Sequence, residues 1–294
     1  MSEIRTETVP LVDGSDLRLT VAEPLGAVRG GIVVLHEARG VTDAVRGLVR
    51  GLAAEGWLTV APHLYHRDDT DEIGEDDGDR IREQLDRLDG GQVMADTDTA
   101  FGWLAEHSVT ADRMGVLGFD IGATVALLVA TERTMGAAVS VADEASVSAV
   151  RDRLPSTVDA MVGLTCPWLG LYGREDDGDG DADAAELRDA SIKAESVTNV
   201  VVYPRSGHRF DADPAAAADA WQRTLNWFDA HLRRLRGMRP GPTSVPRVGV
   251  QVSRPHPSDS GWVWGDTVQP VPLQRWRPTG PGRLRLVWSM APHC

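Results

Sequence analysis

Asp120 stands where the sequence indicates a sharp turn from a strand into a helix. An apolar run at 114–117 precedes it, an apolar helix beginning near Ala123 follows it, and glycines occupy positions 118 and 122. Small residues on both sides are typical of a nucleophile elbow, in which a strained residue is exposed beside the N-terminus of a helix. A carboxylate there can attack an alkyl carbon, or it can mark the loss of a serine or cysteine that attacked a carbonyl.

Three further loops that follow predicted strands carry groups that could act with Asp120. Residues 36–40 read HEARG, residues 173–176 read GRED and residues 204–210 read PRSGHRF. The carboxyl ends of parallel strands meet at one edge of a sheet, so these loops are expected to converge on one site. The chain order is elbow residue, acid, histidine, which is the order of α/β-hydrolases.

The elements that must position these loops alternate between strands and helices. Strands are expected near 6–9, 17–22, 31–35, 58–61, 114–117, 137–141, 168–172 and 200–203, and helices near 42–55, 93–106, 182–194, 214–235 and from 123 onward. This alternation predicts an α/β protein with a mostly parallel sheet and helices on both faces, preceded by an antiparallel hairpin. The span 143–164 stays open between helix, strand and loop.

Several segments resemble the dienelactone hydrolase family. They read VVLHEARGVTDAVRGLVRGLAAEGWLTVAPHLY, GVLGFDIGATVALL, CPWLGLYGREDD and VVYPRSGHRFD, and AAADAWQRTLNWFDAHL resembles the last helix of the family. They occur in the family's order and cover roughly residues 5–235. The resemblance implies a single domain with the α/β-hydrolase fold, and an enzyme that hydrolyses cyclic enol-lactones and related small esters with a cysteine, a histidine and an aspartate.

The resemblance also implies roles by position. It places Asp120 at the nucleophile, Asp176 as the acid, His208 as the base, Glu37 as the active-site glutamate, and the backbone N–H groups of Ala38 and Ile121 as the oxyanion hole. The departure from the family is an aspartate in place of the cysteine. Two carboxyl groups in one confined site, Glu37 and Asp120, cannot both ionise cheaply, so the pKa of one of them should rise.

Two arginines in the same loops, Arg39 and Arg209, are candidates for binding the substrate. Each could hold an anionic group, and Arg39 could also offset the repulsion between the two carboxyl groups.

The aspartate at position 120 leaves three functions open. The first is hydrolysis of a small ester or lactone, with His208 and Asp176 activating water directly. The second is hydrolysis of alkyl halides or epoxides by a carboxylate nucleophile, because attack on a saturated carbon gives an ordinary ester, whereas attack on an ester gives a higher-energy anhydride. The third is a catalytically degenerate protein that binds a small ligand.

Composition divides the chain near residue 237. Residues 238–294 hold 10 of the 17 prolines, 4 of the 9 tryptophans, and seven arginines against two aspartates. That segment has a formal net charge of +5, so residues 1–237 must have a net charge of −19 to give the −14 of the whole chain. We expect a hydrolase domain over 1–237 and an irregular tail over 238–294 that is disordered or loosely attached. The acidic domain offers no basic surface for nucleic acid.

The expected partner is a small-molecule substrate, bound without a cofactor or a metal ion. The sequence shows no phosphate-binding glycine loop, cofactor fingerprint or cysteine-rich cluster. His63 and His66, on an acidic stretch, are expected to be surface residues rather than metal ligands. Two distant cysteines, an N-terminus without a signal pattern and the lack of a run of about 18 apolar residues predict a cytoplasmic protein without a membrane span. A monomer is the default.

Overall fold

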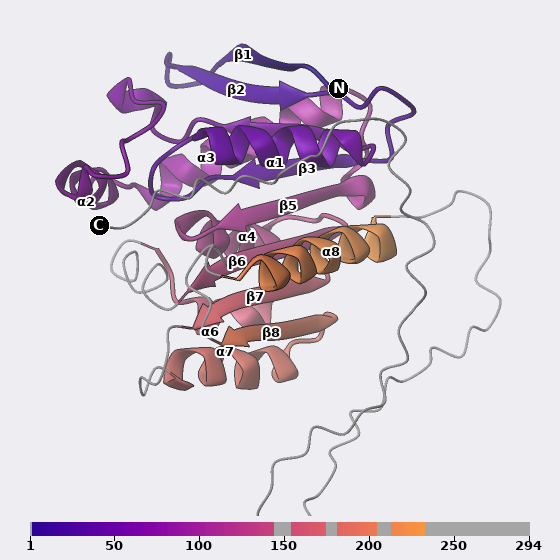
Figure 1. The fold of residues 1–294 in the computed structure, drawn as a ribbon. Helices are drawn as coiled ribbons and strands as arrows, with labels where there is room; N and C mark the ends of the chain where they lie inside the picture. Colours follow the sequence, from indigo (N-terminus) through magenta and orange to yellow (C-terminus); the bar gives the residue numbers. More distant parts are fainter. Residues whose placement is uncertain (1, 144–153, 175–180, 205–212, 233–294) are drawn as a thin grey trace, which may run out of the picture. The chain divides into compact units, whose positions relative to one another are not determined.

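The structure is a computed structural model that describes residues 2–143, 154–174, 181–204 and 213–232 (Figure 1). The predicted acid Asp176, base His208 and substrate-binding Arg209 lie outside these ranges, and so does the whole of 238–294. Their roles, and the division of the chain at residue 237, therefore stay predictions.

Eight strands form one sheet in the order β1-β2-β4-β3-β5-β6-β7-β8. Their bounds are β1 Ile4–Pro10, β2 Asp16–Ala22, β3 Gly31–Leu35, β4 Leu58–Pro62, β5 Met114–Phe119, β6 Ala137–Asp143, β7 Trp168–Arg174 and β8 Thr198–Pro204. The first hairpin is antiparallel and β2 joins β4 antiparallel, whereas every pair from β4 to β8 is parallel. The carboxyl ends of six neighbouring strands therefore share one edge.

Helices connect the parallel strands. Their bounds are α1 Asp43–Ala54, α2 Gly78–Asp86, α3 Gly90–Glu106, α4 Ile121–Glu132, α6 Thr157–Ala160, α7 Asp181–Lys193 and α8 Pro214–His231, with 3-10 turns at His66–Asp68, Ala111–Arg113 and Met161–Gly163. Side-chain caps begin several of them: Thr42 accepts from the Val45 N–H, and Asp89 accepts from the Gln92 N–H. Such caps satisfy N–H groups that a helix leaves unpaired at its first turn.

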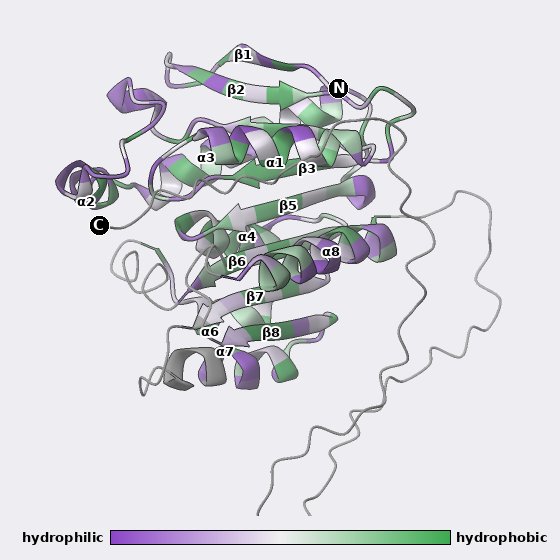
Figure 2. Ribbon diagram, viewed as in Figure 1, coloured by the Kyte–Doolittle hydropathy of each residue, from purple (hydrophilic) through white to green (hydrophobic). Residues whose placement is uncertain are grey.

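Helices cover both faces of the sheet, as the sequence predicts (Figure 1). One apolar cluster joins the sheet to α1 and α8, and a second joins its other face to α3, α4 and α7. Figure 2 shows hydrophobic residues concentrated along the central strands, whereas α2 is largely hydrophilic. In α4 every residue from Ile121 to Ala130 is buried, so this helix is apolar on all sides. The helix behind the elbow is thus fixed within the core.

The predicted α/β-hydrolase architecture is confirmed. The span left open in the sequence resolves in part: Asp143 ends β6, and residues 157–163 form α6 and a 3-10 turn, while 144–153 lie outside the described residues.

Candidate active site

Asp120 forms a strained turn between β5 and α4. Its backbone lies at φ 51° and ψ −112°, a region that side chains of L-residues rarely adopt. Both flanking glycines are required by close backbone approaches. A Cβ on Gly118 would overlap the Gly122 carbonyl, and a Cβ on Gly122 would lie 2.5 Å from the carbonyl oxygen of Leu35. The tight turn that the sequence indicates is therefore present.

The elbow residue is buried, which differs from the exposure expected of it. Asp120 is only 7% exposed. Its N–H donates to the Val141 carbonyl on β6 over 2.9 Å, and its carbonyl accepts from the Ala123 N–H over 3.0 Å. On its other side, the first turn of α4 meets the end of β3 at Leu35. Asp120 is thus enclosed between two neighbouring strands, which explains its low exposure.

Glu37 lies at the same edge of the sheet as Asp120. The parallel register places Leu35 of β3 opposite Gly118 of β5, and each carboxylate follows two residues later. Glu37 is buried, and together with burial its charge raises the pKa of the neighbouring Tyr65. Two buried carboxyl groups therefore belong to adjacent strand ends, as expected from the sequence.

The loop that carries Glu37 is held by the segment that follows β4. The Leu64 N–H donates to Nε2 of His36 over 3.2 Å, and Nδ1 of His36 lies 2.7 Å from the Glu37 carbonyl oxygen. The Tyr65 hydroxyl donates to the Ala38 carbonyl over 3.0 Å. These bonds fix the course of residues 36–38 at the sheet edge.

The backbone N–H groups of Ala38 and Ile121, which are predicted to form an oxyanion hole, belong to the loop after β3 and to the first turn of α4. Ile121 is the first residue of α4, and Ala38 follows Glu37 in the loop after β3. Within the described ranges, neither backbone N–H donates to a backbone carbonyl. Free N–H groups beside a helix N-terminus favour a negatively charged oxygen, because the helix dipole is positive there. Both groups could therefore receive the oxygen of a carbonyl under attack.

Arg39, a predicted substrate-binding residue, is in contact with groups of the protein itself. Its Nε donates to the Ile73 carbonyl over 3.1 Å, and its guanidinium lies 3.6 Å from Glu75 and 4.0 Å from Glu72. An anionic substrate would have to share this charge with two carboxylates, so substrate binding by Arg39 stays a prediction.

Three polar side chains near this edge received no role from the sequence. Asp143 ends β6, is buried and lies on the strand next to β5. A carboxylate that closes a mostly apolar strand was the available signal. His36 and Tyr65 stood within or near a candidate loop, but nothing in the sequence indicated which backbone atoms they would contact.

His63 is buried and the side chain of His66 is only 2% exposed, so the expectation that both are surface residues was wrong. His63 bridges the Thr20 hydroxyl at 2.8 Å and the Asp71 carboxylate at 2.6 Å, and burial lowers its pKa. His66 contacts the carboxylate of Asp96, which lies on α3 and is 0% exposed, over 3.1 Å. The acidic stretch folds back onto the sheet and α3, which removes both rings from solvent.

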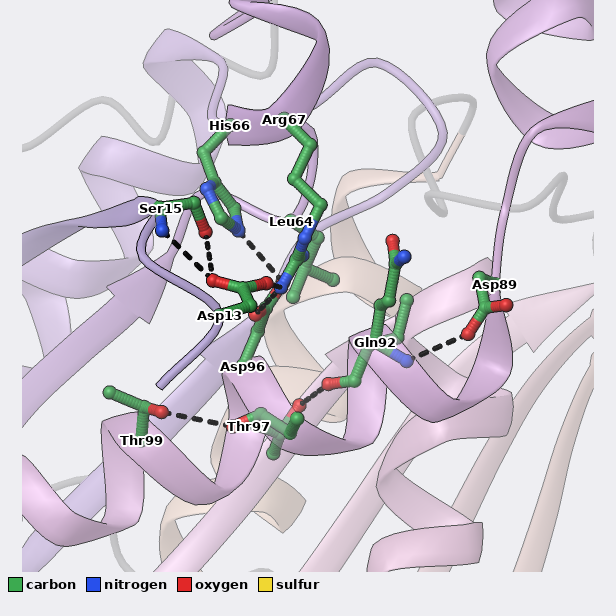
Figure 3. A network of polar contacts seen from close by, with 12 residues as sticks. Asp13, Ser15, Leu64, His66, Arg67, Asp89, Gln92, Asp96, Thr97 and Thr99 are labelled. Carbon is green, nitrogen blue, oxygen red and sulfur yellow. Dashed lines mark hydrogen bonds and ion pairs between the residues drawn. The ribbon is translucent and has the colours of Figure 1, made fainter. Parts of the chain in front are cut away.

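Arg67 completes the ion-pair network around Asp96 (Figure 3). Its guanidinium donates to both carboxylate oxygens over 2.7 and 2.9 Å and reaches Asp13 in the first hairpin over 3.3 Å. In the described part of the chain, no cluster of three or more His, Cys, Asp or Glu residues could hold a metal ion. Among the same residues, no helix has both the length and the apolar character needed to span a membrane.

Together the mostly parallel sheet and the strained elbow define an α/β-hydrolase scaffold. Comparison with known proteins gives the family: the model described as "Dienelactone hydrolase family" matches residues 17–232. The chain belongs to the dienelactone hydrolase family.

Named relatives and a solved structure are consistent with this family. A protein of Salmonella typhimurium named "Putative carboxymethylenebutenolidase" is 31% identical over 204 residues, 67% of this chain and 76% of the relative. A protein of the same name from Methylorubrum extorquens is 30% identical over 234 residues, covering 75% and 78%. The crystal structure titled "Putative Dienelactone Hydrolase" from Klebsiella pneumoniae is 28% identical, with a TM-score of 0.65 over 78% of this chain and 100% of that one.

Proposed function

We propose that this protein hydrolyses a small ester or lactone at the carboxyl edge of its sheet. The observation that carries the proposal is the strained elbow at Asp120 in a chain of this hydrolase family, with the Ala38 and Ile121 N–H groups, which donate to no backbone carbonyl among the described residues. Such an arrangement suits the carbonyl carbon of an acyl group, whose oxygen becomes negatively charged during attack. The names of the relatives, which refer to a lactone-opening activity, support the same substrate class.

Water is the proposed nucleophile. His208 takes a proton from a water molecule as the water oxygen bonds to the substrate carbonyl, and Asp176 orients the imidazole. The N–H groups of Ala38 and Ile121 stabilise the resulting oxyanion. When the carbonyl re-forms, the bond to the leaving oxygen breaks and that oxygen receives the proton from His208. A carboxylic acid and an alcohol, or one hydroxy acid from a lactone, are the products.

Asp120 then acts as an anion that orients the attacking water, because direct attack by its carboxylate would produce an anhydride. The first test compares wild type with Asp120→Asn, which preserves shape and removes the charge, on a panel of p-nitrophenyl esters and enol-lactones. We expect kcat to fall by about 10²-fold, within the range for loss of a group that assists proton transfer. Equal activity in both proteins would contradict the role of Asp120. Lack of turnover by either protein across the panel would contradict ester hydrolysis.

A second test separates water attack from a carboxylate nucleophile. Turnover is run in oxygen-18 water with esters, alkyl halides and epoxides, and the peptide containing Asp120 is weighed by mass spectrometry. Esters should be consumed without label on Asp120. Label would mean that water attacked the carboxyl carbon of an ester formed at Asp120, which is the signature of a carboxylate nucleophile.

A further inference from the structure

The peptide group between Glu37 and Ala38 is held at its carbonyl end. The Glu37 carbonyl oxygen lies 2.7 Å from Nδ1 of His36 and accepts from the Gly40 N–H over 3.1 Å. The N–H of the same peptide group belongs to Ala38. In a planar trans peptide the N–H and the C=O point in opposite directions. Whatever holds the Glu37 carbonyl therefore also sets the direction of the Ala38 N–H.

The hydrogen bonds of His36 determine which ring nitrogen carries the proton. Because the Leu64 N–H donates to Nε2 over 3.2 Å, Nε2 must present a lone pair. A neutral imidazole then carries its proton on Nδ1, which donates to the Glu37 carbonyl. The ring is 0% exposed and stands edge-on to the Tyr65 ring, with centroids 4.9 Å apart.

Burial also keeps this ring neutral. It lowers the pKa of His36 to about 4, with a smaller effect in the same direction from the charge of His63, while the bond to the Glu37 carbonyl opposes the shift. The other ionisable groups nearby are the Glu37 carboxylate and the Tyr65 phenol, which are themselves buried. A single tautomer is therefore expected throughout the neutral range.

The next peptide group is also held by a side chain. The Tyr65 hydroxyl donates to the Ala38 carbonyl, so two successive carbonyls are fixed by side chains. This loop also adjoins the first turn of α4, where a Cβ on Gly122 would meet the carbonyl oxygens of Leu35 and His36. The loop after β3 and the elbow thus meet through their backbones.

We propose that His36 is a positioning residue that turns the Ala38 N–H toward the elbow, where this N–H receives the substrate oxygen. The claim about substrate rests on the proposed function, whereas the direction of the N–H can be measured without turnover. His36 touches no reacting atom and acts through the Glu37–Ala38 peptide group.

The first experiment measures the tautomer in the full-length protein labelled with ¹⁵N-histidine. Nuclear magnetic resonance should show protonated Nδ1 and unprotonated Nε2 for His36 from pH 5.5 to 8. A proton on Nε2, or a doubly protonated ring within that range, would overturn the proposal.

Two variants then separate positioning from general support of the fold. In His36→Asn the amide nitrogen can take the place of Nδ1 and donate to Glu37, while the acceptor for Leu64 is lost. In His36→Gln the amide oxygen can take the place of Nε2 and accept from Leu64, while the donor to Glu37 is lost. Each variant removes the ring and one hydrogen bond. The Ala38 amide resonance should move and exchange faster with solvent in His36→Gln, and much less in His36→Asn. Equal changes in the two variants would refute positioning.

The kinetic comparison uses p-nitrophenyl acetate. We expect kcat of His36→Gln to fall about 10- to 100-fold, less than the roughly 10²- to 10³-fold cost of deleting an oxyanion-hole donor, with KM within about threefold. The kcat of His36→Asn should be about tenfold higher than that of His36→Gln. Equal losses in kcat would overturn the proposal. If wild type hydrolyses no ester while the resonance pattern holds, the proposed function fails and the placement of the N–H by His36 stands.

Discussion

The burial of His36 predicts that the protein loses stability as the pH falls from neutral. Burial lowers the pKa of this imidazole in the folded state from an ordinary value of 6.5 to about 4. In the unfolded chain the ring takes up a proton as the pH falls through about 6.5, whereas the folded protein does not until about 4. Over that interval the unfolded state binds more protons, which lowers its free energy relative to that of the folded state. The contribution of His36 is therefore complete above pH 6.5 and is lost as the pH falls toward 4.

The size of the effect follows from this shift in pKa. Each unit of difference between folded and unfolded states corresponds to about 1.4 kcal/mol, so the full loss approaches about 3 kcal/mol near pH 4. Between pH 7.5 and 5.5, the same relation gives a loss of about 1.3 kcal/mol from this ring. That interval is preferable for measurement because the chain keeps more of its net negative charge, formally −14 at pH 7.

Urea unfolding followed by tryptophan fluorescence measures this loss in wild type and in His36→Asn at several pH values across the interval. Other titrating groups, including His63, contribute to both proteins and cancel in the difference between them. The stability advantage of wild type over His36→Asn should shrink by about 1.3 kcal/mol from pH 7.5 to 5.5. If the two curves of stability against pH run parallel, the ring does not resist protonation and the reasoning fails.

Three further substitutions test the scaffold. Gly122→Ala should lower the free energy of unfolding by about 3 kcal/mol or more, because the new Cβ meets the backbone oxygens of Leu35 and His36 at the end of β3, and thermal unfolding measures the loss. Arg67→Gln should cost about 3 kcal/mol in urea unfolding by leaving the Asp96 carboxylate buried with its main cation removed, and a double variant with Arg67→Met and Asp96→Leu should recover most of it. Tyr65→Phe should cost about 1 kcal/mol in the same assay and lower kcat for p-nitrophenyl acetate, since the Ala38 carbonyl loses its donor.

Elements with a strong local signal could be predicted from the sequence. The strand expected at 31–35 has the bounds Gly31–Leu35, because a fully buried apolar run is closed by a polar loop. The helix expected at 42–55 begins after Thr42, whose side chain caps it. By contrast, α2 was indicated only as part of an acidic stretch, because GDRIREQLD presents too few apolar residues to define a helix period.

The site was predictable where its geometry is local. Gly118 and Gly122 are needed within a few residues of Asp120, so the turn left a readable pattern. The contact between Leu64 and His36 spans 28 positions of the sequence, and the contact between Arg67 and Asp96 spans 29. They depend on how loops pack against other elements, which a single sequence does not specify.

The features that hold the elbow do not depend on which side chain occupies position 120. Positive φ costs about 1–3 kcal/mol for any residue with a Cβ, so the strain is similar for aspartate and cysteine. The close approaches at Gly118 and Gly122 and the Ala38 and Ile121 N–H groups belong to the backbone. Under the proposed function, aspartate therefore changes the attacking group and leaves the proposed receptor for the carbonyl oxygen in place. Its negative charge is favoured beside the N-terminus of α4, where it can orient water more readily than it can be acylated.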